Sequence, residues 1–216
     1  MADSLLCTVI CAQAFAERPL LFHLSFDDGL EGVASDGRFI KPAASGKVKF
    51  VDGFKGTGLA FEEGGFLSFP TRGIFPLGSG SIEMYVKPLF PPGGGKFRTF
   101  FAAHGSAYNI NSFQMDRGSH PSFGFAIHGH DKCGVSVSCD DALLKQNQWT
   151  HVRGRWDLKK KSIALYVNGL KVDSRDCPSI DVRSVGDTIY FGSCPGADER
   201  GCMSVLDEIN IYGGEE

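Results

Sequence analysis

Polar side chains of the kind that bind sugars lie in the middle of this sequence, among aromatic residues. The candidates for ligand binding are Tyr85, Arg98, His104, Asn111, Gln114, Arg117 and His128. Guanidinium, amide and imidazole groups hydrogen-bond sugar hydroxyls, and an aromatic ring offers an apolar face for sugar C–H groups. The alternative for each residue is an ordinary solvated strand face, where polar side chains are most often found.

Two pairs of acidic residues lie near the ends of the chain. Asp27 and Asp28 end a predicted first strand, and Asp207 and Glu208 lie in a predicted last strand. If these strands pair, the carboxyl groups converge and offer oxygens to calcium, which takes six to eight oxygen ligands. The alternative is structural: Asp27 and Asp28 accept hydrogen bonds from turn amides, and Asp207 pairs with an arginine.

Two shorter motifs carry weaker signals. His128 and His130 would share one strand face and chelate a transition metal, although two exposed turn histidines are the simpler interpretation. Arg153 and Arg155 share a face with His151 and would hold an anionic sugar or a sulfate, again with a solvated face as the alternative. The sequence contains no G-x-S-x-G, P-loop or H-E-x-x-H motif.

These side chains must be positioned by strands, because apolar and polar residues alternate with a period of two along the chain. Gly58–Phe61 and Phe66–Phe69 are predicted as two short strands, and Trp149 is expected to bury a large area at the start of another. Asn168-Gly169 predicts a tight hairpin. Only residues 141–146 suit a helical turn. The pattern predicts roughly 12–14 strands in a two-sheet antiparallel β-sandwich.

Composition excludes several classes of function. The 216 residues carry a net charge of −3, which disfavours a general electrostatic grip on nucleic acid or an anionic membrane. No apolar run is long enough for a transmembrane helix. We therefore expect a globular all-β protein with no nucleic-acid partner.

The first 16 residues end in Ala14-Phe15-Ala16, a pattern that signal peptidase cuts. Residues 1–16 are predicted as a signal peptide, with an N-terminal lead as the alternative because no basic residue precedes the apolar run. Residues 17–216 are predicted as one domain. Export would place the protein outside the cell or on its surface, where a Cys194–Cys202 bridge is plausible.

A succession of sequence blocks points to a family. The blocks LSFDDG, FKGTGLAFEEGGFLSF, GSIEMYVKP, NQWTHVRGRWD, SIALYVNGLKVD, IYFG and SVLDEINIY occur in this order. This order resembles the laminin-G-like branch of the concanavalin A-like lectin/glucanase jelly rolls over residues 20–212. The resemblance is specific for the fold, whereas the family's functions range from sugar binding and adhesion to glycoside hydrolysis and polysaccharide cleavage.

The resemblance adds expectations about sites. It implies a structural calcium ion with Asp27 and Asp207 as the best side-chain ligands, and a binding face on the middle strands. Lyases of this fold use Tyr or His with Arg, Gln or Asn on that face. The E-x-D-x-x-E spacing of the family's retaining glucanases is absent, which counts against that activity.

We therefore predict an extracellular, non-catalytic lectin-like or adhesion module that binds a polysaccharide or another glycan, with structural calcium. The first alternative is a polysaccharide lyase or an atypical glycoside hydrolase that acts on the concave face. The second is a structural surface protein that self-assembles, as a homo-oligomer or in a larger assembly, through exposed edge strands.

Overall fold

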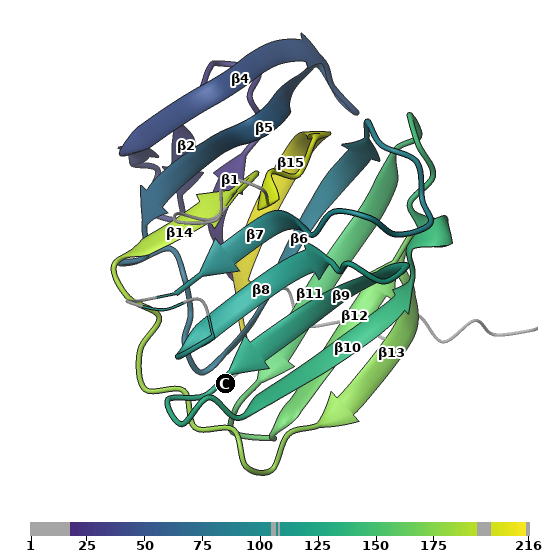
Figure 1. Cartoon of the computed structure of the whole chain (residues 1–216). Helices are drawn as coiled ribbons and strands as arrows, with labels where there is room; N and C mark the ends of the chain where they lie inside the picture. Colours follow the sequence, from purple (N-terminus) through teal and green to yellow (C-terminus); the bar gives the residue numbers. More distant parts are fainter. Residues whose placement is uncertain (1–17, 105–106, 108, 194–199, 215–216) are drawn as a thin grey trace, which may run out of the picture.

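The computed structural model describes residues 18–104, 107, 109–193 and 200–214 (Figure 1). The predicted signal peptide or lead at residues 1–16 lies outside this part of the chain. Within it, the strands are β1 (Leu20–Leu24), β2 (Gly32–Ala34), β3 (Phe39–Ile40), β4 (Ala44–Asp52), β5 (Thr57–Pro70), β6 (Ser79–Pro88), β7 (Arg98–Ala103), β8 (Ser112–Arg117), β9 (Ser122–His128), β10 (Gly134–Asp140), β11 (Thr150–Asp157), β12 (Ser162–Val167), β13 (Leu170–Asp176), β14 (Thr188–Phe191) and β15 (Ser204–Gly213). One turn of 3₁₀ helix, η1 (Asp141–Leu143), lies within the predicted helical turn.

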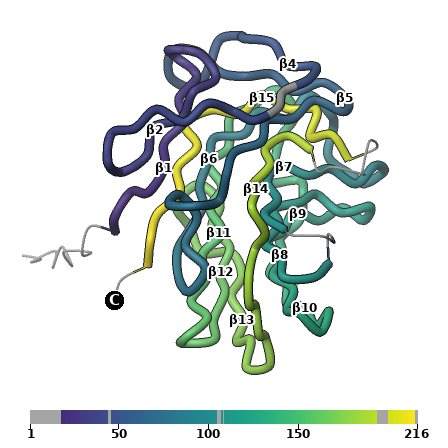
Figure 2. The backbone as a smooth tube through the Cα atoms, turned by 90° about the vertical axis from the view of Figure 1, so that its left-hand side faces the viewer, coloured from purple at the N-terminus to yellow at the C-terminus, as the bar shows by residue number. Residues whose placement is uncertain are grey.

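The strands form two antiparallel layers, as predicted. They hydrogen-bond in the order β10-β9-β8-β7-β14-β5-β15-β6-β11-β12-β13. Figure 2 shows β6, β11 and β12 in one layer and β7, β8 and β9 in the other. At the far edge the layers meet, because the backbone N–H of Ser138 in β10 donates to Asp173 Oδ2 in β13 at 3.0 Å. The all-β jelly-roll prediction is confirmed.

Aromatic rings fill the space between the layers. Trp156 of β11 is 1% exposed, and its ring centroid lies 5.0 Å from that of Phe113 in β8 and 6.0 Å from that of Phe125 in β9. Such ring pairs each add about 0.5–1.5 kcal/mol beyond the area they bury. Trp156, rather than Trp149, is the fully buried tryptophan; Trp149 lies just before β11 and is half-buried.

Turns and termini follow the sequence closely. Asn168 and Gly169 adopt φ of 49° and 79° between β12 and β13, as the hairpin prediction requires. β1 pairs with β15, with Leu24 opposite Ile209. This pairing brings the acidic residues near the two chain ends into one region of the molecule.

One strand prediction is wrong. The two short strands predicted on either side of residues 62–65 form a single 14-residue strand, β5. Gly64 adopts φ of 76°, and the register with β4 shifts between Gly46 and Val48. A bulge therefore absorbs the glycines that suggested a turn.

The cysteines of the described residues are free thiols: Cys133, Cys139, Cys177 and Cys202. Cys194, the predicted partner of Cys202, lies outside the described residues. No helix in the described part of the chain has the length and apolar character needed to cross a membrane.

Candidate functional site

The structure separates the predicted sugar-binding residues, and four of them are buried, among them Arg98 and Arg117. Arg117 is 2% exposed. Its Nε donates to Asp141 Oδ2 at 2.8 Å and its Nη1 donates to the Lys96 carbonyl at 3.0 Å. Arg98 is 9% exposed, and its Nη1 donates to the Gly201 carbonyl at 3.0 Å. Both guanidinium groups pack on the ring of Phe90. Their positions therefore give them a structural role.

Three more candidates, His104, Gln114 and His128, lie on the outer side of the β7–β10 layer. The side chains on either side of Gln114 in β8 point into the core, so Gln114 points outward. Gln114 and His104 are nevertheless buried, with exposed fractions of 2% and 9%. Gln114 Nε2 donates to Ser112 Oγ at 2.9 Å, and Ser112 Oγ lies 3.2 Å from His128 Nδ1. Burial lowers the pKa of His128. These polar groups are largely satisfied by one another rather than presented to solvent.

The remaining turn residues also have local partners. Asn111 adopts φ of 47°, and its Oδ1 accepts a hydrogen bond from the backbone N–H of Arg183 at 3.1 Å. His130 follows β9 and lies 3.4 Å from Asp181 Oδ2, whereas His128 contacts Ser112. The two histidines thus have separate partners, in keeping with the simpler interpretation of the H-x-H motif.

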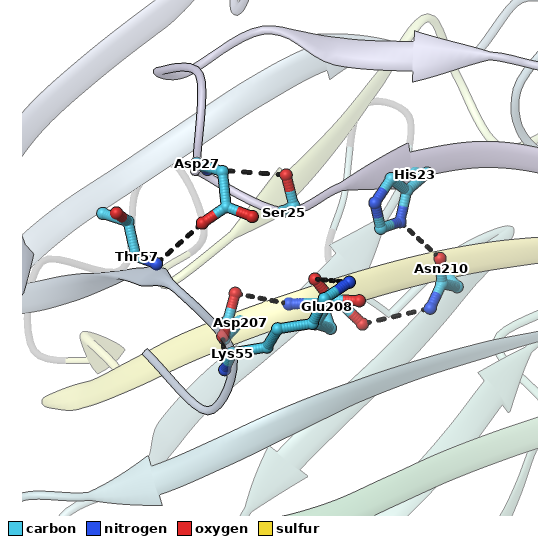
Figure 3. Close-up of polar contacts among 8 residues, drawn as sticks. All are labelled: His23, Ser25, Asp27, Lys55, Thr57, Asp207, Glu208 and Asn210. Carbon is cyan, nitrogen blue, oxygen red and sulfur yellow. Dashed lines mark hydrogen bonds and ion pairs between the residues drawn. The ribbon is translucent and has the colours of Figure 1, made fainter. Parts of the chain in front are cut away.

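The predicted calcium residues do converge, on one turn between β4 and β5 (Figure 3). Asp27 Oδ1 accepts a hydrogen bond from the backbone N–H of Thr57 at 2.7 Å. Asp207 Oδ2 accepts one from the backbone N–H of Lys55 at 3.0 Å, and its Oδ1 accepts one from Glu208 at 2.8 Å. Gly56 permits this approach, because a Cβ there would lie 2.1 Å from Asp27 Oδ1. Both aspartates therefore anchor the turn through its amides.

These partners do not fit a calcium site built from side chains. Asp207 is fully buried with both carboxyl oxygens facing N–H donors, and burial raises its pKa. The ammonium group of Lys55 lies 3.8 Å from Glu208 Oε1. Among the described residues, no group of three or more His, Cys, Asp or Glu side chains is arranged to hold a metal ion. Calcium binding stays a prediction from the sequence.

The outer side of the other layer carries larger and more polar side chains. We call it the β11 face and define it by the cross-strand row of Glu83, Arg153, Tyr166 and Lys171 with their neighbours Tyr85, His151 and Arg155. Gly154 faces the interior, since a Cβ there would lie 2.6 Å from Phe125. Arg153 and Arg155 therefore point outward from β11.

Aromatic residues occupy one end of the β11 face. The ring of Tyr85 stacks on Phe54 with centroids 3.6 Å apart and lies 5.0 Å from the ring of His151. Phe54 is 48% exposed. Trp149 contacts the edge of Phe54 at 6.1 Å and carries the Lys87 ammonium 4.8 Å from its ring. Tyr85 is thus the predicted site residue that lies on this face.

A titratable cluster lies at the β6 side of the β11 face. Glu83 Oε1 accepts a hydrogen bond from the Tyr212 hydroxyl at 3.1 Å, and Glu83 Oε2 lies 3.6 Å from His151 Nε2. Burial alone would raise the pKa of Glu83, but hydrogen bonding and charge from His151, with help from Tyr212 and Arg18, lower it. Burial and the charge of Glu83 raise the pKa of Tyr212 to about 12.

A groove of about 480 Å³ lies at the other end of the β11 face, across β11, β12 and β13. Its floor includes Ala164 and Tyr166, and its walls include Arg155, Lys171 and Ser174. The guanidinium group of Arg153 lies 5.1 Å from the centroid of the Tyr166 ring, at the margin of the groove. An aromatic ring, hydroxyl groups and cations therefore converge on one open hollow.

Tyr166 and Lys171 are the site residues that the sequence analysis missed. A signal for them exists: the Asn168-Gly169 hairpin fixes the register of β12 and β13, and the outward alternation of His151, Arg153 and Arg155 defines the face that they share.

Comparison with known proteins agrees with this architecture. A family model described as the concanavalin A-like lectin/glucanases superfamily, Laminin_G_3, matches residues 61–215. No curated protein sequence matches the chain significantly.

Solved structures with a similar fold include three toxin domains. The receptor binding domain of botulinum neurotoxin C/D mosaic serotype has a TM-score of 0.71 at 15% identity, covering 92% of this chain and 48% of that chain. The binding domain of Paraclostridial Mosquitocidal Protein 1 has a TM-score of 0.72 at 15% identity, covering 92% and 49%. The botulinum neurotoxin serotype G binding domain has a TM-score of 0.70 at 14% identity, covering 91% and 48%.

The present chain thus spans about half the length of these toxin domains, and identity at this level carries the fold alone. The family match is independent of these structures, because it rests on the sequence, and the family model covers most of the chain. By that match, and in agreement with the resemblance seen in the sequence, the protein belongs to the concanavalin A-like lectin/glucanase superfamily as a laminin-G-like member.

Proposed function

We propose that the protein is a non-catalytic, lectin-like module that binds a glycan through the groove on the β11 face. The observation that carries this proposal is the open hollow of about 480 Å³ in which the ring of Tyr166 lies beside Arg155, Lys171 and Ser174. An aromatic ring with convergent polar groups is the usual composition of a small-molecule site. The named function of the similar toxin domains, receptor binding, supports the same class.

The lining of the groove favours a sugar over a compact apolar ligand. The groove is open to solvent, and its lining includes polar side chains such as Ser162 and Ser174. A pyranose presents hydroxyls around its edge and C–H groups on its faces, so it can contact both the polar walls and the Tyr166 ring. The groove therefore offers both kinds of contact that a sugar ring requires.

The pKa directions on the β11 face support binding rather than proton transfer. An efficient general acid or base has a pKa near the working pH. The pKa of Tyr212 rises to about 12, which leaves its hydroxyl protonated and a poor base. The pKa of Glu83 falls below its ordinary value, which leaves its carboxylate a weak base and removes it as an acid at neutral pH. Glu83 and Tyr212 are therefore poorly tuned for the proton transfer that the lyase alternative requires.

Location outside the cell and assembly into homo-oligomers stay predictions from the sequence. Detection of the protein in culture medium, with N-terminal sequencing to find a cut after Ala16, tests the first. Sedimentation over a range of concentrations tests the second.

The binding proposal is tested by isothermal titration of the chain with a panel of neutral and acidic oligosaccharides of matched length. The Tyr166→Ala variant removes the ring from the groove, and the Tyr190→Ala variant is its matched control, since Tyr190 is also half-buried but lies on β14 in the other layer. We expect Tyr166→Ala to weaken binding at least tenfold and Tyr190→Ala to leave it within twofold.

Two results would contradict the proposal. Equal losses in both variants would move the site away from the groove. An increase in absorbance at 235 nm during incubation with an acidic polysaccharide would show new unsaturated ends and establish the lyase alternative.

A further inference from the structure

We propose that the groove selects glycans that carry an anionic group, a carboxylate or a sulfate, and that Arg155 and Lys171 hold this group. The inference rests on the proposed function, because it names the class of ligand for the same groove. It is carried by the charge pairing of the residues that line the hollow.

The groove contains more cations than its carboxylates can neutralise. Its lining includes Arg155, Lys160, Lys171 and Arg175 against Asp157 and Asp176. Lys160 pairs within this lining with Asp157 at 3.6 Å, and Arg175 pairs with Asp173 of β13, which lies outside the lining, at 3.8 Å. In a chain whose net charge is −3, this local excess of positive charge is a specific feature of the groove.

Two of the cations are left for a ligand. Among the described residues, no carboxylate oxygen lies within 4.0 Å of the charged group of Arg155 or Lys171. They stand on β11 and β13, on opposite sides of Ala164 and Tyr166 in β12. An anion above β12 would therefore meet a positive side chain from each flanking strand.

The margin of the groove adds a third donor. Arg153 stacks on Tyr166, and its Nε is buried without a hydrogen-bond partner among the described residues. A buried donor left unpaired destabilises the fold. A ligand anion near the margin of the groove would meet the positive charge of this guanidinium group, and charge-assisted bonds from guanidinium groups are among the stronger hydrogen bonds.

Several features favour a glycan over nucleic acid or an anionic membrane. A nucleic acid contact is built from cations that follow the phosphate backbone over many residues, whereas the unpaired cations here flank one short groove. A membrane-binding surface would combine cations with exposed apolar residues at the same place. The exposed ring of Phe54 lies at the other end of the β11 face, and the lining of the groove combines its cations with a ring and serines, the contacts that a single charged sugar would use.

The test compares three oligosaccharides of equal length: a sulfated one, one that carries uronic acids without sulfate, and a neutral one. Each is titrated into the full chain and into the Arg155→Gln and Lys171→Gln variants by calorimetry. The matched controls are Arg72→Gln and Lys49→Gln, which change exposed cations in the turn after β5 and on β4. We expect each groove variant to weaken binding of an anionic oligosaccharide about tenfold and to leave neutral binding within twofold.

Raising the salt concentration from 50 to 500 mM should also weaken anionic binding more than neutral binding, because exposed charges are screened. The sulfated and uronic arms identify which anion the groove prefers.

Other outcomes would overturn the inference. If the neutral oligosaccharide binds as tightly as the anionic ones and depends on Tyr166, the inference fails while the proposed function stands. If the control variants lose as much as the groove variants, the effect is one of general charge and the inference also fails. Binding of duplex DNA or of anionic phospholipid vesicles that depends on Arg155 and Lys171, without glycan binding, would overturn both proposals.

Discussion

The two outer faces of the sandwich are built by the same strand alternation but carry different chemistry. Across β7, β8, β9 and β10, one outward row is Ala102, Gln114, Ala126 and Ser136. Across β6, β11, β12 and β13, the corresponding row is Glu83, Arg153, Tyr166 and Lys171. We call the first the β8 face. The side chains of its row are small, except for Gln114, which donates to Ser112 of the same strand, whereas the β11 face presents long charged and aromatic side chains.

The difference shows where a binding function resides in a common fold. On the β8 face, Gln114, Ser112 and His128 form one chain of polar contacts, so these three side chains bond to one another rather than to a ligand. On the β11 face, Arg155 and Lys171 line a groove without carboxylate partners among the described residues. Polar residues alone do not mark a site; polar residues with unused capacity do.

The largest effect should come from breaking the buried ion pair at the end of β8. Arg117→Met leaves Asp141 without its guanidinium partner, although Asp141 is 2% exposed and still accepts from the Gly93 N–H at 3.1 Å. Removing one member of a buried pair typically costs about 3–5 kcal/mol. We expect a loss of this size in the free energy of unfolding, measured by urea denaturation.

The double variant Arg117→Met with Asp141→Leu separates charge from packing. It removes both buried charges, so it should be more stable than the single variant even though Asp141 no longer binds Gly93. Equal stability of the two variants would show that Arg117 acts through packing on Phe90, and the ion-pair explanation would be lost.

The next prediction compares one polar residue from each face. Gln114→Ala removes the amide that donates to Ser112, and Gln114 is 2% exposed, so we expect a loss of about 1–3 kcal/mol. Lys171→Ala changes an exposed side chain and should stay within about 0.5 kcal/mol. The effect on glycan affinity should be the reverse: Lys171→Ala should weaken glycan binding more than Gln114→Ala does. A Lys171→Ala variant that melts as early as Gln114→Ala would contradict the distinction between the faces.

The sequence was sufficient to predict the fold, because its main signals are local. Alternation with a period of two predicted the strands, Asn168-Gly169 predicted a hairpin, and the first and last strands pair as the convergence of the two acidic pairs requires. The bulge in β5 was missed because Gly64 and Gly65 suit a turn as well as an irregular strand, and only the register of β4 decides between them.

The site was harder to predict, because it depends on which polar groups find partners across the fold. Arg117 and Arg98 have the residue type of a sugar ligand, yet contacts with Asp141 and the Gly201 carbonyl hold them inside. Conversely, the sequence left Arg155 open between a ligand for an anionic sugar and a solvated strand residue. Its significance appears only when β13 places Lys171 across the groove, a relation that spacing along one strand does not contain.

A smaller effect, on pH dependence, should also differ between the faces. Burial lowers the pKa of His128 from its ordinary value of 6.5. The unfolded chain therefore takes up this proton first, and stability falls as the pH drops below about 6.5. The lowered pKa of Glu83, ordinarily 4.5, means that its carboxylate stabilises the fold above about pH 4.5 and that this contribution is lost as the pH falls further.

Melting curves recorded between pH 3.5 and 8 check the direction of both pH effects on stability. His128→Gln should flatten the decline that begins near pH 6.5, and Glu83→Gln should flatten the decline below pH 4.5. If His128→Gln leaves the upper part of the profile unchanged, desolvation of this imidazole does not control stability on the β8 face.

The smallest shift is expected from calcium, for which the sequence and the structure make opposite forecasts. The family resemblance predicts that calcium binds Asp27 and Asp207. In the structure, these carboxylates accept hydrogen bonds from the backbone N–H groups of Thr57 and Lys55.

Calcium at 100 times its dissociation constant would add about 2.7 kcal/mol to the free energy of unfolding, which corresponds to a rise of several degrees in the melting temperature of a chain of this size. Because N–H donors already face these oxygens, we expect the melting temperatures in calcium and in EDTA to agree within about 1 °C. The variant Asp27→Ala should lower both equally, through loss of its bond to Thr57. A rise in calcium that disappears in this variant would instead establish a metal site and show that the turn between β4 and β5 rearranges to form it.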